Sequence, residues 1–375
     1  MTIGRLVLTA FRNYPDLRLA FDQRPVVITG ANGAGKTNLL EAISFLAPGR
    51  GLRGARAAAV TCQATPSQPW AVAAHLFTPD GPVDLGTGLA PATHGTFSDK
   101  RVVHIDGLAQ RGQAALARRL GVVWLTPAMD RLFADGPASR RKFLDRLTVA
   151  LDPDHAGRTA AYDRALRQRA RLVRDNVRDP TWFAALHDTL ARYGVAVAAA
   201  RSHMVERLNR ALADAAGPFP SADLGLTGEV DGWLAAMPAV DAEDRLRQAL
   251  DRARSDPAAA EAGPHRSDLE VIFRRPGHAS DGQPAQLCST GEQKALLVAI
   301  VLAQARLQAA ARGHAPILLL DEVAAHLDVD RREALFDAVL ALRAQAWMTG
   351  TDAGVFAGLS GAVQRLCVAA GTVHV

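Results

Sequence analysis

The sequence predicts an α/β protein in which a helical segment interrupts a domain built on a sheet. Before Leu144 and again after Asp268, short apolar runs alternate with turns, a pattern typical of strands. Between Leu144 and Leu250, alanine, leucine and arginine dominate with helical periodicity. The order is therefore α/β, then helical, then α/β, and the simplest account is one domain split by an insertion.

The expected strands are short and apolar. They are Leu6–Leu8, Pro25–Thr29, Ala71–Phe77, Val102–Ile105, Val122–Leu125, Leu269–Phe273, Ile317–Leu320, Ala346–Met348 and a terminal run from Val363 to Val375. Helix breaks are expected near Asp179-Pro180 and between Gly217 and Pro220. We expect one domain from residues 1–135 together with 264–375, and a helical insertion domain from residues 136–263. The insertion has no sustained heptad, which favours a short helical lobe over a long coiled-coil arm.

A glycine-rich loop follows the second expected strand and matches the pattern G-x-x-x-x-G-K-[ST] at every fixed position. Its residues are Gly30, Ala31, Asn32, Gly33, Ala34, Gly35, Lys36 and Thr37, with Asn38 opening a helix. Glycines let successive backbone N–H groups converge on anionic oxygens, and the helix dipole adds to this attraction. Lys36 can reach the β- and γ-phosphates, and Thr37 can ligate Mg²⁺. The loop therefore predicts a nucleoside triphosphate site with Mg²⁺ as its metal ion.

Two carboxylates follow the apolar run Ile317–Leu320. Residues at the carboxyl end of a parallel strand face the crevice in which nucleotides bind. Asp321 is suited to hold Mg²⁺, and Glu322 is suited to orient or deprotonate an attacking water. With Lys36, these two residues are the predicted catalytic set.

The composition allows several partners and restricts the compartment. Net charge is +5, with 49% hydrophobic and 22% charged residues, which fits a globular protein that can bind a polyanion. The three cysteines have no paired spacing, and no export segment is recognised, so we expect reduced thiols and a cytoplasmic location. The longest apolar run, Ala295–Ala303, is too short to span a bilayer, and no membrane partner is expected.

A further segment, Leu287 to Gln293, precedes a long expected helix that ends at Ala311. Its spacing to Asp321 resembles that of ABC-type ATPases, where an L-S-G-G-Q signature precedes the second carboxylate motif by about one helix. Ser289 and Gly291 match this form, whereas Cys288, Thr290 and Glu292 depart from it. Residues 325–328 then resemble the D-loop of the same ATPases.

With these elements, the chain resembles the RecF family of bacterial recombinational-repair ATPases, which are related to SMC heads. The resemblance runs nearly end to end. Further segments that carry it are Phe11–Tyr14, Gly136–Asp145, Gly263–Leu269, Cys288–Gln293 and Thr349–Asp352. Where transporter ATPases carry a switch histidine, this chain has Thr349 and Thr351.

The resemblance implies an ABC/SMC-type P-loop ATPase head with a helical insertion domain, and a weak DNA-dependent ATPase that acts as a switch. It implies an ATP-dependent homodimer in which ATP lies between Lys36 of one subunit and Ser289, with Gly291, of the other. It also implies binding to gapped DNA and single-strand/duplex junctions, and cooperation with RecR and RecO in loading a recombinase. Gap repair, replication and the SOS response are the processes implied.

Several positions keep two interpretations. By resemblance, Arg12 and Asn13 contact the nucleotide; from the residues alone they form a strand-end turn. Gln63 and Gln68 are both candidates for a Q-loop glutamine. His265 and Arg266 either bind phosphate or bridge the two lobes.

One stretch of the insertion carries a usable pattern for DNA. Tyr162, Leu166, Ala170 and Val173 share one helical face, and four arginines share the opposite face. These arginines are Arg164, Arg167, Arg171 and Arg174. An arginine stripe suits a phosphate backbone and predicts salt-dependent binding, although a solvated helix face in an arginine-rich protein has the same pattern.

Three other functions use the same phosphate loop. A transporter-type ATPase would drive a membrane partner, and a small-molecule kinase would need an acceptor site and no signature segment. Another SMC-like head would act in chromosome structure, and the short insertion argues against it.

Overall fold

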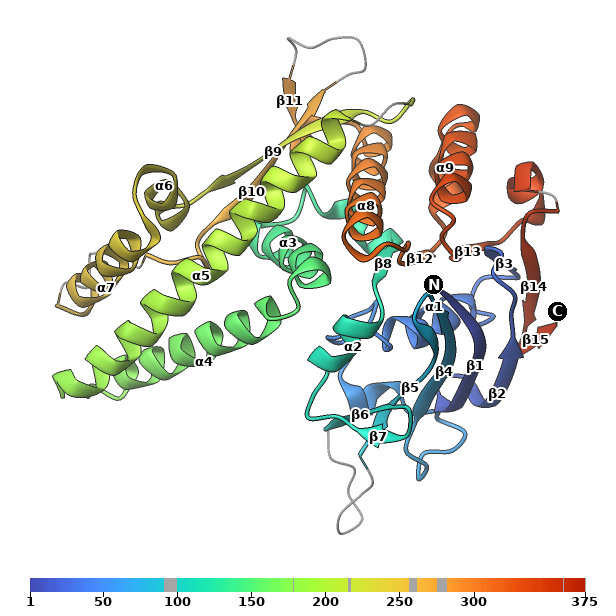
Figure 1. The fold of residues 1–375 in the computed structure, drawn as a ribbon, viewed down its shortest axis with the longest axis horizontal. Helices are drawn as coiled ribbons and strands as arrows, with labels where there is room; N and C mark the ends of the chain where they lie inside the picture. The colour runs from blue at the N-terminus through green and yellow to red at the C-terminus, as the bar shows by residue number, and fades with distance from the viewer. Residues whose placement is uncertain are drawn as a thin grey trace. The chain divides into compact units, whose positions relative to one another are not determined.

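The computed structural model describes residues 1–90, 100–177, 179–214, 217–255, 262–274, 282–359 and 361–374, without the side chains of residues 255, 325 and 326. The chain forms two compact units (Figure 1). The first unit contains Met1–Asp130, Ala215–Pro220 and Thr290–Val375, and the second contains Arg131–Asp214 and Ser221–Ser289.

An antiparallel sheet forms one half of the first unit. Its strand order is β2-β1-β4-β5-β6-β7. The strands are β1 (Thr2–Phe11), β2 (Tyr14–Ala20), β4 (Ala71–Thr78), β5 (Gly81–Leu89), β6 (Arg101–Ile105) and β7 (Leu108–Ala109). In β4, buried Val72, Ala74 and Leu76 alternate with more exposed residues, so one face of the sheet contributes to the core. The sequence analysis did not predict β2, β5 or β7.

A largely parallel sheet forms the other half of this unit, with the strand order β15-β14-β3-β13-β12-β8. The strands are β3 (Val26–Thr29), β8 (Val122–Leu125), β12 (Ile317–Leu320), β13 (Ala346–Gly350), β14 (Gln364–Ala369) and β15 (Thr372–His374). All but β15 run parallel to their neighbours. The four residues of β12 are fully apolar and buried, as expected for a strand covered on both faces.

Helices complete the first unit. They are α1 (Lys36–Ser44), α2 (Ala114–Arg119), α8 (Thr290–Arg312) and α9 (Val329–Ala341). Short 3₁₀ turns are η1 (Ala57–Val60), η2 (Pro127–Arg131), η4 (Val323–His326) and η5 (Ala353–Leu359). Helix α8 is long and apolar enough to cross a membrane by length and composition, but 72% of its apolar 18-residue stretch is buried inside the structure. Residues Gln293–Ala305 of this helix are all buried in the unit.

The core of the first unit joins residues of both sheets with helix α1. Phe11, Phe45 and Trp70 meet edge to face with ring centroids 5.1–5.8 Å apart, and each is at most 1% exposed. Phe21 packs in the same manner on Trp347 of β13, at 4.5 Å. The first set joins the end of β1 to the end of α1, and the second contact joins the segment after β2 to the parallel sheet.

The second unit combines helices with a small antiparallel sheet. Its helices are α3 (Pro137–Leu151), α4 (His155–Arg174), α5 (Pro180–Ala213), α6 (Glu229–Ala236) and α7 (Ala239–Ser255). Its strands are β9 (Ser221–Thr227), β10 (Asp268–Arg274) and β11 (Gly282–Pro284), followed by the turn η3 (Ala285–Leu287). Helices α4 and α5 run side by side (Figure 1). The 34 residues of α5 span about 50 Å.

The insertion is therefore not wholly helical. Strand β9 pairs along its whole length with β10, from Ser221–Arg274 to Thr227–Asp268. This pairing draws β10 and β11 into the second unit, although both follow residue 264 in the chain. The sequence-based division into one domain from residues 1–135 with 264–375 and a second domain from residues 136–263 stays a prediction.

The apolar face expected for α4 is partly wrong. Tyr162 is buried and Leu166 is half-buried, but Ala170 is exposed and Val173 is 53% exposed. The buried line instead runs through Tyr162, Ala165 and Arg169. Arg169 can be buried because His187 and the carbonyl of Leu250 accept its hydrogen bonds, which the helical periodicity did not reveal.

Candidate functional site

The glycine-rich loop connects β3 with α1 at the carboxyl end of the parallel sheet. Gly30, Gly33 and Gly35 have φ angles of 148°, 79° and 118°. At Gly35 a Cβ atom would lie 2.5 Å from Nδ2 of Asn13, so a side chain has neither the conformation nor the space there. The loop thus takes the tightly curled form that its glycines predict.

Lys36 is folded back over this loop. Its side chain is buried, at 4% exposure, and its ammonium donates hydrogen bonds to the carbonyl oxygens of Gly30 at 2.7 Å and Ala31 at 2.9 Å. The loop holds a buried cation within its curve, which is the arrangement that attracts an anionic ligand.

Asp321, at the end of β12, connects three elements of the site. Its Oδ1 accepts hydrogen bonds from Thr37 Oγ1 at 3.0 Å and from Thr349 Oγ1 at 2.7 Å. Since β13 pairs with both β12 and β3, the ends of the three strands meet at one edge of the sheet. This places Thr37 and Asp321, 284 residues apart in sequence, in direct contact.

These two oxygen-bearing side chains fit Mg²⁺, which takes few protein ligands and completes its shell with phosphate and water oxygens. Among the described residues, no cluster of three or more His, Cys, Asp and Glu residues could hold a metal ion. A cation held by these two side chains would leave most of its coordination positions to other oxygen ligands.

Glu322 lies beside this cluster. It is half-buried, and its backbone N–H donates to Thr349 Oγ1 at 2.9 Å. Its backbone is left-handed, with φ 50° and ψ 25°, a conformation that costs energy in a non-glycine residue. Thr349 bonds both Asp321 and Glu322 and so fixes the start of the turn after β12.

A charged network lies between the loop and β1. Glu41 of α1 is 0% exposed and accepts hydrogen bonds from Arg12 at 2.7 and 2.8 Å and from Arg53 at 2.9 Å. Asn38 Nδ2 donates to Asn13 Oδ1 at 2.7 Å, and Arg53 donates to Asn38 Oδ1 at 2.6 Å. Arg12 and Asn13, in the turn between β1 and β2, are thus held next to the loop.

The sequence analysis did not single out Glu41, Arg53 or Tyr14 for this site. An acid inside the apolar stretch Leu39–Ile43 is the signal that could have revealed Glu41. Tyr14 is buried, donates to the Gly35 carbonyl at 3.0 Å, and has its pKa raised to about 12 by burial. It remains a neutral donor that supports the turn of the loop.

Arg101 fixes the other end of α1. Its guanidinium donates to the carbonyl oxygens of Phe45, Ala47 and Gly49, where the helix dipole is negative. Burial lowers the pKa of Arg101 to about 10, so the group remains protonated at neutral pH.

The signature segment begins helix α8. Ser289 and Gly291 are exposed, and a Cβ atom at Gly291 would meet no heavy atom within 4 Å. Ser289 belongs to the second unit and the loop to the first, so the set that the structure brings together is Lys36, Thr37, Asp321 and Glu322. Just beyond Ser289, Lys294 is 3% exposed, and its ammonium lies 3.5 Å from Asp130 Oδ2, which anchors the first turns of α8.

The remaining predicted residues are distributed over the chain. Gln63 and Gln68 are both exposed in the turns before β4, and neither is distinguished as a Q-loop residue. The side chain of His326, in the D-loop segment, lies outside the described residues. The four arginines of the stripe, Arg164, Arg167, Arg171 and Arg174, are all exposed on α4.

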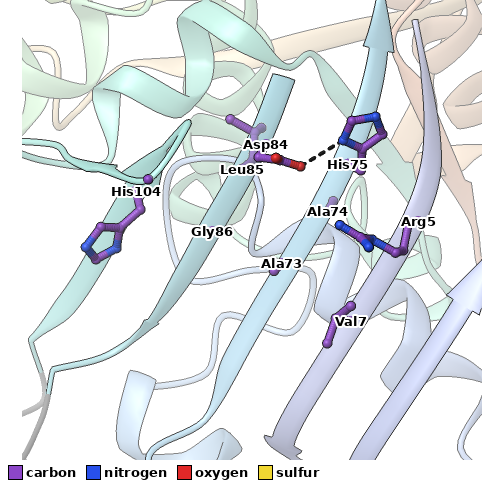
Figure 2. Close-up of a pocket in the computed structure, with 10 residues that line it drawn as sticks. Arg5, Val7, Ala73, Ala74, His75, Asp84, Leu85, Gly86 and His104 are labelled. Carbon is purple, nitrogen blue, oxygen red and sulfur yellow. Dashed lines mark hydrogen bonds and ion pairs between the residues drawn. The ribbon is translucent and has the colours of Figure 1, made fainter. Parts of the chain in front are cut away.

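The first unit also has a hollow of about 250 Å³ on the outer face of its antiparallel sheet (Figure 2). Small residues, Ala73 and Gly86, lie among its lining, and His75 is bonded to Asp84 at 2.8 Å. It is formed by strands β1, β4, β5 and β6, and it includes none of the predicted site residues.

The fold and this site define the class of the protein: an α/β P-loop ATPase head of the ABC/SMC type. The model of the RecF/RecN/SMC N-terminal domain matches residues 2–367. The SMC head bound to the C-winged helix domain of ScpA covers 99% of the chain with a TM-score of 0.57 at 16% identity, with 95% of that structure covered. At this identity the likeness shows the fold.

Comparisons with individual proteins identify the family within this class. The DNA replication and repair protein RecF of Mesorhizobium japonicum is 50% identical over 99% of this chain and 97% of its own length. That of Rhizobium meliloti is 47% identical over 99% and 98%. A solved structure of the recombination mediator protein RecF with ATPrS, in the RecFOR pathway, has a TM-score of 0.82 at 20% identity over 99% and 97%. The chain belongs to the RecF family of DNA replication and repair proteins.

Proposed function

We propose that this protein is an ATP-dependent DNA-binding protein of recombinational repair and replication, in which ATP closes a dimer on DNA and slow hydrolysis reopens it. The family membership supports the repair role. The observation that carries the ATP switch is the contact of Thr37, beside the phosphate-binding Lys36, with Asp321 and Thr349.

The loop residues bind the triphosphate. The ammonium of Lys36, now bonded to the carbonyls of Gly30 and Ala31, exchanges these partners for β- and γ-phosphate oxygens. The curled backbone of residues 30–35 and the amino end of α1 supply N–H donors. Asn38 and Asn13 border the same site through their mutual hydrogen bond, and Arg12 is held beside it by Glu41.

Thr37 and Asp321 are the residues that would hold Mg²⁺, with Asp321 kept in place by Thr349. When bound, Mg²⁺ neutralises charge on the β- and γ-phosphates. Glu322 orients or deprotonates the attacking water, and the strained turn that Thr349 holds in place keeps it at the end of β12.

A second copy of the chain completes the site. Ser289 and Gly291 are exposed at the amino end of a 23-residue helix, where the positive end of the helix dipole can attract a γ-phosphate held by the partner subunit. The dimer is then favoured only while ATP is intact, so hydrolysis releases it.

The DNA partner is gapped DNA with single-strand/duplex junctions, and RecR and RecO are the protein partners, as the family suggests. The arginine stripe on α4 contacts the phosphate backbone. Exchange of Arg167 and Arg171 for Gln would then flatten the salt dependence of DNA binding, by about one unit of slope for each phosphate that the variant no longer binds. If the salt dependence of DNA binding does not change, these arginines do not contact the DNA backbone.

Sedimentation velocity tests the switch. With ATP and gapped DNA we expect a dimer, and without ATP a monomer. The variant Lys36→Ala should remain monomeric under both conditions while its fold is unchanged. Rapid ATP turnover by a stable monomer would contradict the proposal, and closure on blunt duplex as readily as on gapped DNA would contradict the junction preference.

A further inference from the structure

A pocket of about 190 Å³ lies within the second unit, between helices α3, α4 and α5 and the segment Gly263–Ser267. Its volume corresponds to about six water molecules at about 30 Å³ each. Two segments that the sequence analysis singled out meet here: α3 supplies Ala138, Arg141, Lys142 and Asp145, and the second segment supplies Pro264 and His265. The ATP site uses neither segment.

Positive charge predominates in the lining. Arg141, Lys142 and Arg201 contribute three cations, against two carboxylates from Asp145 and Asp163. Asp145 is already engaged: its two oxygens accept from Arg201 at 2.8 and 2.9 Å, and Oδ1 also bonds His155 at 2.7 Å. Burial alone would raise the pKa of Asp145, but these bonds outweigh it and hold the pKa below its ordinary value.

Arg141 and Lys142 are not neutralised in this way. One Arg141 nitrogen donates to the carbonyl of Ser267 at 2.7 Å, which orients the guanidinium without cancelling its charge. Burial and the nearby charge of Arg201 lower the pKa of Arg141. Lys142 is exposed at the rim. An anion in the pocket would relieve this repulsion and find donors on one wall.

Tyr162 and His265 give the pocket a built polar wall. The Tyr162 hydroxyl and His265 Nδ1 are 2.6 Å apart, and Tyr162 is only 3% exposed. Gly263 precedes this pair with φ 154°, and a Cβ atom there would collide with the Tyr162 oxygen. The backbone is therefore shaped to let the tyrosine and histidine meet.

We propose that this pocket binds a single phosphate group through Arg141 and Lys142, with the Tyr162–His265 pair as its polar wall. The phosphate comes either from a nucleic-acid backbone or from a free phosphate compound, and the two sources have the same recognition chemistry. If the phosphate belongs to a nucleic-acid backbone, the inference rests on the proposed function. The pocket would then give the second unit a defined DNA contact.

Lys142→Gln is the decisive variant, because Lys142 is exposed and its exchange leaves the core untouched. Lys142→Arg restores the charge. Arg252→Gln, which removes an exposed charge from α7 of the same unit, controls for net charge. For the phosphate titration all are made with Lys36→Ala, so that the glycine-rich loop does not contribute to phosphate binding. For the DNA titration Lys36 is kept, so that ATP can still close the proposed dimer.

Two titrations separate the sources. Inorganic phosphate is titrated by calorimetry, and gapped DNA is titrated in the presence of ATP by fluorescence anisotropy at several salt concentrations. We expect Lys142→Gln to weaken binding about tenfold, as for the removal of one charge-assisted hydrogen bond, with recovery in Lys142→Arg and no change in Arg252→Gln.

Weaker DNA binding, with a salt slope smaller by about one, assigns the phosphate to nucleic acid. Weaker phosphate binding with unchanged DNA binding assigns it to a free compound. If Lys142→Gln and Arg252→Gln bind each of the two ligands with equal affinity, the proposal that this pocket binds phosphate is wrong. If DNA does not bind at all, the proposed function fails, while the phosphate titration still decides the pocket.

Discussion

Glu41 shows how single residues shape the nucleotide site. It is completely buried, and its charge is compensated by Arg12 and Arg53, whose side chains are 24% and 42% exposed. One carboxylate thereby fixes a residue of the turn after β1 and a residue of the loop after α1 beside the glycine-rich turn. Removing one partner of a buried pair costs more than forming the pair contributes, since it leaves uncompensated charge.

We expect Glu41→Gln to lower the free energy of unfolding by about 1–3 kcal/mol, because Arg12 is deprived of its bidentate partner although it remains partly hydrated. Urea denaturation measures the change. Glu333→Gln, at an exposed position of α9, is the matched control and should lie within about 0.5 kcal/mol of the parent. Equal midpoints for both variants would show that the network does not stabilise the fold.

At the scale of elements, a buried histidine joins the helices of the second unit. His187 of α5 has no exposed side-chain surface. Its Nε2 accepts from Arg169 Nε of α4 at 3.1 Å, so Nδ1 carries the proton and donates to Asp251 of α7 at 2.6 Å. The neutral ring is the form that satisfies both contacts. Burial lowers the pKa of His187, against the opposing influence of Asp251.

This arrangement predicts acid sensitivity. The folded-state pKa lies below the ordinary value of 6.5, so the unfolded chain takes up the proton first as the pH falls. Stability is complete above about pH 6.5 and decreases below it until the folded pKa is passed. Thermal unfolding between pH 8 and pH 5 should show this decrease, which His187→Gln should reduce.

The matched control for that series is His203→Gln, at an exposed position of the same helix. It should keep the pH dependence of the parent. The melting temperature of the parent should fall more steeply between pH 7 and pH 5 than that of His187→Gln. Equal slopes would show that His187 is not the source of the acid sensitivity.

At the scale of the whole molecule, the proposed switch depends on contacts between distant segments. Thr37, Asp321 and Thr349 come from three segments of the chain and meet at one sheet edge, and Glu322 is attached to the same cluster through its backbone. In the proposed mechanism, loss of the γ-phosphate would therefore alter contacts at the ends of β12 and β13 together. In the proposed dimer this links hydrolysis to opening.

We expect Glu322→Gln to retain ATP binding and to reduce hydrolysis about a hundredfold or more, because the amide orients water but does not accept its proton. The ATP-bound dimer should then persist on DNA. Phosphate release and the dissociation rate from labelled gapped DNA measure the two effects. Slow hydrolysis with an unchanged dissociation rate would separate turnover from opening and contradict the switch.

The parts of the molecule that depend on neighbouring residues could be predicted from the sequence. The strand before the glycine-rich loop, the helix after it and the long helix α8 follow from local conformation and apolar periodicity. The exposed arginines of α4 followed the same periodicity, whereas its buried line did not, because Arg169 is satisfied by partners from α5 and α7.

What the sequence determined by itself is the presence of a phosphate-binding loop and of an acidic pair after an apolar strand, since each is a local pattern with its own backbone chemistry. Only the tertiary structure decided that Thr37 and Asp321 touch, that β9 pairs with β10, and that Arg141 and His265 line one pocket. These contacts join residues that are tens to hundreds of positions apart. Their formation depends on strand order and side-chain packing across the whole fold, which no local pattern contains.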